Sequence, residues 1–179
     1  MQGGAPTIRA ATRRDVDALV HINVASWREA WSALLPAGTQ RPPDDELRAR
    51  VREVIESSEV ELAVAEVGGE VVGLATFGAS RDDDATSAVG ELRALMVDPA
   101  HWRRGLGRAL VAHALDRLRA SGRSEVTLWS LADSEQAAAF YAAQGFARNG
   151  HTQGRAAFGN APEQRWRRGL DAAEAATGS

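Results

Sequence analysis

The chain has 179 residues, of which 44% are hydrophobic and 25% charged, a composition that is ordinary for one soluble globular domain. Its net charge of −3 provides no overall attraction to nucleic acid or to an anionic membrane, and the absence of cysteine excludes disulfides, cysteine-ligated zinc and a cysteine nucleophile. Because neither a signal peptide nor a stretch long enough to cross a bilayer is visible, we expect a single cytoplasmic domain over residues 5–171, with flexible termini at 1–4 and 172–179.

The first part of the chain predicts a strand followed by two helices. A short strand is expected over residues 7–10, and Thr12 with Asp15 forms a capping-box pattern at a helix start. Apolar residues then recur at helical spacing until Pro36: Val16, Leu19, Val20, Val24, Trp27 and Trp31. A second helix is expected over residues 44–57, with acidic residues in its first turn.

A change to alternating apolar residues then predicts a β-hairpin. Residues 60–65 and 71–77 are its expected strands, and Gly68-Gly69 forms the tight turn between them. Three consecutive aspartates follow at 82–84. We interpret them as a solvated loop, and a rarer alternative is a patch that attracts a cationic ligand.

The stretch 91–110 reads ELRALMVDPAHWRRGLGRAL and predicts a strand, a turn and a helix that continues to about residue 120. No Ser, Thr, Asp or Asn directly precedes Gly105, so the first backbone N–H groups of this helix lack an obvious side-chain cap. The turn also carries three arginines: Arg103, Arg104 and Arg108. These features predict a phosphate or pyrophosphate site, and the alternative is an ordinary connection whose arginines face water.

Two nucleotide-binding patterns do not fit this turn. No Gly-Lys-Ser or Gly-Lys-Thr follows a glycine loop, and the third glycine of the dinucleotide pattern would fall on Leu110. None of the four histidines has a second ligand at metal spacing, so we assign no metal site.

The remainder predicts a strand, a helix and a hairpin. The strand at 126–129 is expected to run parallel to the strand at 91–97, across the intervening helix. Asp133 is expected to cap the next helix, which Gly145 ends. The closing hairpin is expected over residues 146–152 and 164–170.

Two stretches together resemble the GNAT superfamily of N-acetyltransferases. The strand and Gly-x-Gly turn at 91–110 are similar to the family's signature for acetyl-CoA, and residues 131–146, LADSEQAAAFYAAQGF, resemble the pattern Asn-x-x-Ala-x-x-Phe-Tyr-x-x-x-Gly-Phe. Two positions depart from the family. Trp102 stands where Gln or Arg is usual, and Ser134 stands where Asn is usual.

This resemblance implies an α+β fold, a three-layer sandwich in which helices flank a mixed, mostly antiparallel sheet that splays at its central strands. It implies acetyl-CoA as the cosubstrate, with Ser134 donating to it and the backbone of Leu95, Met96 and Val97 pairing with the pantetheine arm. The residues that would bind the pyrophosphate are Arg103, Arg104, Gly105, Leu106, Gly107 and Arg108.

Catalytic roles are implied in the same way. Tyr141 would be the acid that protonates the leaving thiolate, and the alternative is a packing residue whose hydroxyl bonds the backbone. Glu91 would accept the proton of the amine, often through water, and the alternative is a carboxylate paired with Arg93 or another cation. A bulge, usual in this strand of the family, would change the direction in which Glu91 points.

Trp27 and Trp31 share one helix face, so they either wall an apolar acceptor pocket, as the resemblance implies, or pack in the core or against a helix. The function expected is acetyl transfer to a primary amine, on a small molecule or peptide. An acyl-CoA-binding module without turnover is the alternative, and a nucleotide-binding regulator is a third. The sequence leaves the acceptor, and whether the chain forms a homodimer, undetermined.

Overall fold

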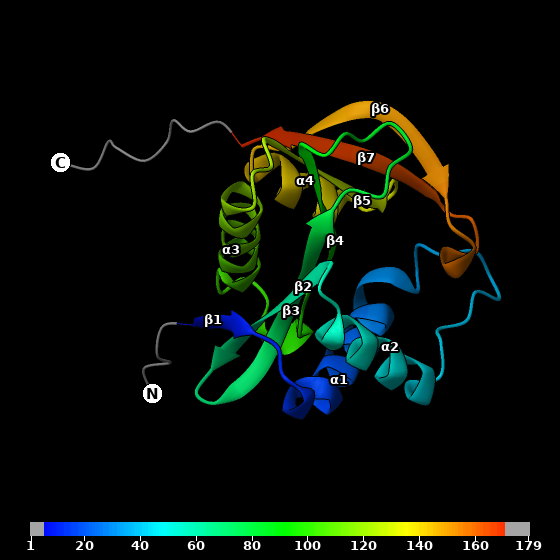
Figure 1. Ribbon diagram of the computed structural model, residues 1–179. Helices are drawn as coiled ribbons and strands as arrows, with labels where there is room; N and C mark the ends of the chain where they lie inside the picture. The colour runs from blue at the N-terminus through cyan, green and yellow to red at the C-terminus, as the bar shows by residue number, and fades with distance from the viewer. Residues whose placement is uncertain (1–5, 171–179) are drawn as a thin grey trace.

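The structure is a computed structural model that describes residues 6–170. The termini expected to be flexible, 1–4 and 172–179, lie outside the described residues. One seven-stranded sheet forms its centre, in the order β1-β2-β3-β4-β5-β7-β6 (Figure 1). The strands are β1 Thr7–Ala10, β2 Val60–Val67, β3 Glu70–Ala79, β4 Val89–Val97, β5 Glu125–Leu131, β6 Ala147–Gly154 and β7 Pro162–Gly169.

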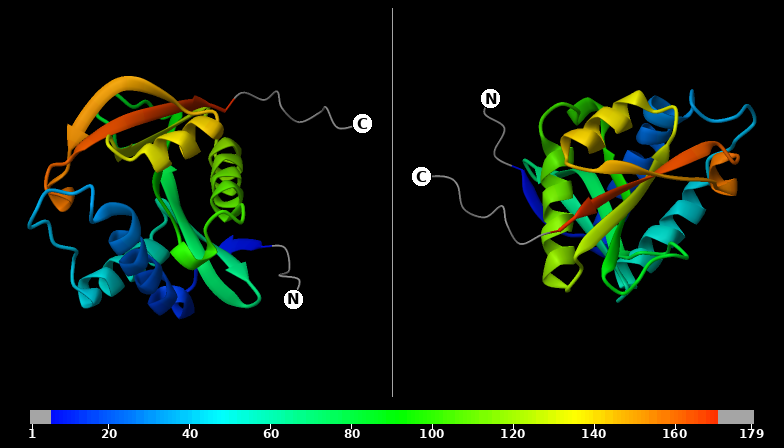
Figure 2. Two further views of the ribbon diagram at one scale, coloured as in Figure 1. Left: turned by 180° about the vertical axis from the view of Figure 1, so that it is seen from behind. Right: turned by 90° about the horizontal axis from the view of Figure 1, so that it is seen from above.

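Helices cover both faces of this sheet (Figure 2). Those on one face are α1 Val16–Ser26, which continues into a π-helical turn over Trp27–Trp31, and α2 Asp44–Glu56. Those on the other face are α3 Leu106–Ala120 and α4 Glu135–Ala143. The α+β three-layer architecture expected from the resemblance is therefore confirmed. No helix among residues 6–170 has both the length and the apolarity that a membrane crossing requires.

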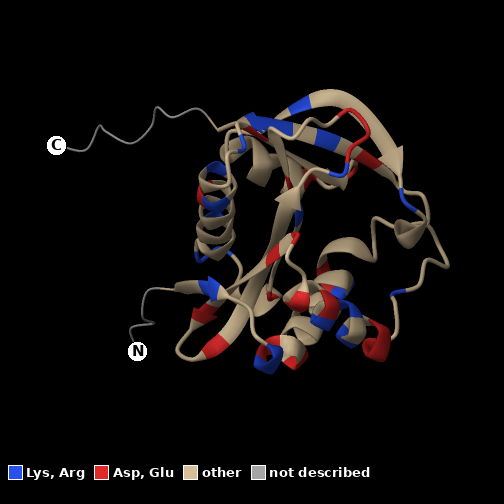
Figure 3. Ribbon diagram, viewed as in Figure 1, with Lys and Arg blue, Asp and Glu red and all other residues tan. Residues whose placement is uncertain are grey.

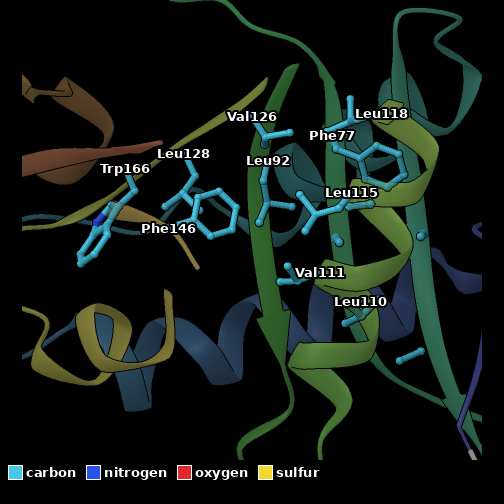
Figure 4. Close-up of a cluster of buried hydrophobic side chains, with 14 of the residues drawn as sticks. Phe77, Leu92, Leu110, Val111, Leu115, Leu118, Val126, Leu128, Phe146 and Trp166 are labelled. Atoms are coloured by element: carbon cyan, nitrogen blue, oxygen red, sulfur yellow. The ribbon is translucent and has the colours of Figure 1, made fainter. Parts of the chain in front are cut away.

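The main hydrophobic core lies between the sheet and α3. The core side of α3 contributes Leu110, Val111, Leu115 and Leu118, which pack on Phe77 and Leu92 (Figure 4). At Gly90 a Cβ atom would lie 2.9 Å from the side chain of Leu118, so this glycine allows the helix to approach the strand closely. A second cluster on the opposite face joins Leu19 and Ile22 of α1 to β2 and β3.

The strands β4 and β5 run parallel, as predicted, but they pair only at the start of β4. The paired residues are Val89 with Glu125, Gly90 with Val126, and Glu91 with Thr127. All other neighbouring strands are antiparallel. Beyond Glu91 the edge of β4 no longer pairs with β5, which produces the expected splay.

A β-bulge at Arg93 accompanies this split. In the pairing of β4 with β3, Leu92 lies opposite Phe77 and Ala94 opposite Thr76, so Arg93 has no partner. The extra residue reverses the alternation of the side chains. Leu92 before the bulge and Leu95 after it both pack on the α3 side, whereas Ala94 packs on the α1 side. The bulge expected here is confirmed.

Two expectations about local structure need correction. The N-cap of α4 is Ser134, not Asp133, and its side chain accepts a hydrogen bond from the backbone N–H of Ala137. The aspartates at 82–84 lie in a loop in which Asp83 and Asp84 are exposed, as expected, but Asp82 is largely covered, and Asp82 and Asp84 both pair with Arg165 of β7. Figure 3 shows this acidic loop lying beside the basic strand β7.

Candidate active site

The turn between β4 and α3 is tied back to the end of β4. The indole Nε1–H of Trp102 donates to the backbone oxygen of Val97 at 2.7 Å, and the Asp98 side chain accepts from the backbone N–H of Ala100 at 2.9 Å. These contacts hold the start of the helix at the open end of the split between β4 and β5. Trp102 thus has a structural role in this chain.

The N-terminus of α3 carries no side-chain cap, as the sequence predicts. Gly105 takes a positive φ of 81°, and nothing lies within 4 Å of the position where a Cβ would stand. Arg103, Arg104 and Arg108 are exposed and form no ion pair within residues 6–170, whereas Arg117 and Arg119 at the other end of α3 do. Open backbone donors beside unpaired guanidinium groups suit a diphosphate.

Gly107 has a packing role that the sequence does not reveal. A Cβ atom there would lie 3.2 Å from the ring of Phe140, so the absence of a side chain lets α4 pack against α3. The contribution of Gly107 to phosphate binding stays a prediction.

Tyr141 lies on α4 among aromatic rings, at centroid distances of 5.3 Å from Phe140, 6.0 Å from Phe146 and 6.3 Å from Trp166. Burial raises the pKa of its hydroxyl to about 12, and no hydrogen bond to a described residue contributes to that pKa. The ring is therefore packed, as one interpretation expected. The hydroxyl, however, has no backbone partner among residues 6–170 and is free to donate to a ligand.

Ser134 and the β4 backbone are the other residues expected to contact a cofactor. The Ser134 oxygen accepts from Ala137 at 3.3 Å, which leaves its own hydrogen available to a ligand. Leu95, Met96 and Val97 lie in the part of β4 that does not pair with β5. The carbonyl of Val97 is engaged by Trp102.

Glu91 lies at the closed end of the split, where it pairs with Thr127 of β5, and only 3% of it is exposed. Its oxygens accept three hydrogen bonds from Arg81: one from the backbone N–H at 3.1 Å and two from the guanidinium at 2.9 Å and 2.6 Å. Arg93 lies further away, at 3.9 Å. The ion-pair interpretation thus describes the geometry of Glu91, with Arg81 as the main cation, and a role as base stays a prediction.

A second polar network lies on the same face of the sheet as Glu91 and joins the acidic loop to β5 and β7. The sequence analysis did not predict it. The Asp82 carboxylate accepts from the indole Nε1–H of Trp129 at 2.8 Å and from the Thr127 hydroxyl at 3.1 Å. Arg165, which is 3% exposed, donates to both oxygens of Asp84 at 2.5 Å and 2.7 Å and holds its pKa at about 2. Since Asp84 and Arg165 are 81 residues apart, no local pattern indicates this pairing.

Trp27 and Trp31 meet at an edge-to-face centroid distance of 6.0 Å. Both also contact Phe158 of the β6–β7 connection, at 6.4 Å and 5.6 Å. All three rings are partly exposed, and none belongs to either buried cluster, so they pack on one another outside the core, and a role in an acceptor pocket stays a prediction. One turn before Trp27, the Asn23 side chain contacts the sulfur of Met96 at 3.6 Å, so this part of α1 lies over the unpaired part of β4.

A family model described as the acetyltransferase (GNAT) family matches residues 24–146, a range that includes both the turn before α3 and the whole of α4. The chain belongs to the GNAT family.

Several GNAT relatives show how far this similarity extends. The mycothiol acetyltransferase of Beutenbergia cavernae is 47% identical over 60 residues, which are 34% of this chain and 20% of that protein. The match therefore spans about a fifth of the length of that relative. The aminoglycoside N(6')-acetyltransferase type 1 of Stenotrophomonas maltophilia is 29% identical over 149 residues, which cover 82% of this chain and 89% of the relative.

Solved structures of GNAT proteins share the fold. An N-acetyltransferase from Staphylococcus aureus superposes with a TM-score of 0.73 at 20% identity, covering 94% of this chain and all of that one. A putative acetyltransferase from Salmonella typhimurium, described with its cofactor acetyl-CoA, superposes with a TM-score of 0.70 at 22% identity, covering 98% of this chain and all of that one.

Proposed function

We propose that this GNAT chain transfers an acetyl group from acetyl-CoA to a primary amine, with both substrates bound together. The observation that carries the proposal is the uncapped start of α3 at the open end of the split between β4 and β5, with three arginines that form no ion pair within residues 6–170. The N-terminus of a helix attracts phosphate groups, and an unpaired strand edge can pair with an extended ligand such as the pantetheine arm. Binding both substrates in one cleft can supply much of the rate through proximity.

In this proposal Arg103, Arg104 and Arg108 bind the phosphates together with the backbone N–H groups of residues 105–107. The pantetheine arm lies along Leu95, Met96 and Val97, and Ser134 donates a hydrogen bond to it. Acetyl-CoA supplies the acetyl group as a thioester: the amine nitrogen bonds to the carbonyl carbon, the C–S bond breaks, and the thiolate leaves. A backbone N–H of the β4 edge would polarise the carbonyl.

Tyr141 would donate a hydrogen bond, and finally a proton, to the departing sulfur. This role is supported by the hydroxyl group, which makes no hydrogen bond to any of residues 6–170 and so can donate to the sulfur. The amine must lose a proton. Glu91 would receive that proton through water, on a lone pair that its three hydrogen bonds from Arg81 leave free.

The second candidate is an acyl-CoA-binding module without turnover. It is favoured by one observation, the engagement of Glu91 by Arg81, because a carboxylate held in a bidentate ion pair is a poor base. The two functions share the cofactor site and differ only in whether free thiol is released.

Calorimetric titration of acetyl-CoA, followed by an assay of free thiol with a panel of amines, tests both functions. Arg104→Glu should weaken acetyl-CoA binding by about tenfold or more, because it places a carboxylate beside the phosphates. Arg52→Glu, an exposed substitution on α2, is the matched control and should leave binding unchanged. Equal affinity in the wild type and Arg104→Glu would show that the phosphates bind elsewhere, and binding without thiol release would establish the module.

A further inference from the structure

The register of β5 and β7 places several polar side chains on the face of the sheet that lies opposite α3 and α4. Thr127, Trp129 and Leu131 alternate along β5 and share one face. Arg165 of β7 pairs with Trp129, and Glu163 pairs with Leu131, so they project to the same side. Glu91, paired with Thr127, completes the set. This face, with Glu91 at the closed end of the split, is the one that an acceptor amine would approach.

Every carboxylate described on this face is already bound to a guanidinium group. Arg81 pairs with Glu91, Arg165 pairs with Asp82 and Asp84, and Arg155 donates to Glu163 at 2.7 Å and 2.5 Å. Glu163 is 1% exposed, and Glu91 3%. Separating either of these two from its guanidinium group would leave a buried charge uncompensated, so Glu91 and Glu163 are not available as partners for further ammonium groups. The Asp84 side chain is 52% exposed and is held by Arg165 at the acidic loop.

The apolar surface near this face comes from three rings, Trp27, Trp31 and Phe158, which join the end of α1 to the β6–β7 connection. The guanidinium carbon of Arg155 lies 4.7 Å from the centroid of Phe158. A guanidinium group of the protein therefore already lies over the π-face of Phe158, beside the two indoles. What these rings still offer is flat apolar contact.

We infer that the acceptor is a monoamine whose body is an aromatic or other flat apolar ring, and not a polycation such as a polyamine or an aminoglycoside. The inference rests on the proposed function and names its substrate class. One amine is the reacting group, and it needs no second anionic anchor. The ring of the acceptor packs against Trp27, Trp31 and Phe158, where a further ammonium group would lie beside the guanidinium group of Arg155 and find Glu163 already paired with it.

The test compares kcat/KM for phenethylamine and tryptamine with kcat/KM for spermidine and kanamycin, using acetyl-CoA and the full chain. We expect the arylalkylamines to be preferred by about tenfold or more. Trp31→Ala should raise the KM for phenethylamine by about tenfold while leaving the KM for acetyl-CoA unchanged, and Trp31→Phe should restore most of the loss because it keeps a ring. Arg28→Ala, an exposed change in the same turn, is the matched control.

A binding measurement separates this inference from the proposed function. The protein saturated with CoA is titrated with phenethylamine, and its indole fluorescence is recorded. Saturable binding that Trp31→Ala weakens supports the inference. Acetyl-CoA binding without any binding of arylalkylamines overturns it, and so does preferred acetylation of spermidine or kanamycin, which would still establish an acetyltransferase. Failure to bind acetyl-CoA would instead overturn the proposed function.

Discussion

Replacing Tyr141 by Phe removes one hydroxyl and leaves the ring in place among Phe140, Phe146 and Trp166. The structure sets the size of the expected loss. An acid with a pKa of about 12 is weak relative to a thiol, whose ordinary pKa is about 8.5, so full proton transfer to the leaving thiolate is uphill. The main contribution of the hydroxyl is then a hydrogen bond to a charged sulfur, worth about 1.5–3 kcal/mol. That energy corresponds to about a 10- to 160-fold decrease in kcat.

The assay is steady-state release of free thiol by the wild type and Tyr141→Phe, with the best acceptor of the amine panel and with the KM for acetyl-CoA measured in parallel. We expect kcat to fall and that KM to stay near the wild-type value, because the hydroxyl acts on the departing sulfur. The melting temperature should be unchanged, since the ring contacts persist. With a pKa of about 12, Tyr141 should also cause no loss of activity near pH 10. A kcat within about twofold of the wild type, or a wild-type alkaline loss near pH 10 that Tyr141→Phe abolishes, would refute this reasoning.

Two further predictions concern the elements that position the site. Arg9 and Thr12 hold the pKa of Asp15 at about 2 against an ordinary 3.8, so this carboxylate contributes about 2 kcal/mol of stability that is present above about pH 4 and lost as the pH falls through about 2. Denaturant unfolding at pH 7 should show that Asp15→Asn has lost most of this free energy. If the unfolding free energy of the variant still falls between pH 4 and 2 as steeply as that of the wild type, the prediction is contradicted. Trp102→Phe removes the 2.7 Å bond to Val97 and should cost about 1 kcal/mol in unfolding free energy. It should also raise the KM for acetyl-CoA with little change in kcat, and a loss confined to kcat would argue against a positioning role.

Much of the local structure could be predicted because it depends on neighbouring residues. The strand at 7–10 was predicted with its observed bounds, and the helix predicted at 44–57 ends one residue earlier. Gly68 and Gly69 both take the positive φ that a tight hairpin requires. The uncapped start of α3 was equally visible, because a cap is a property of the few residues around a helix end.

Partners across the sheet were not predictable in this way. The cation that binds Glu91 is Arg81 rather than its near neighbour Arg93, because the bulge at Arg93 changes the side-chain phase within β4. The pairing of the aspartates at 82 and 84 with Arg165 depends on β7 lying between β5 and β6.

The sequence by itself therefore determined the elements, the uncapped, arginine-rich turn before α3 and the family resemblance. These follow from periodicity, capping and turn chemistry, which are set by residues close together in the chain. Only the tertiary structure decided which charges are neutralised and which rings meet between the end of α1 and the β6–β7 connection. Those contacts depend on strand order and register, and a one-residue change in register moves a side chain to the opposite face of the sheet.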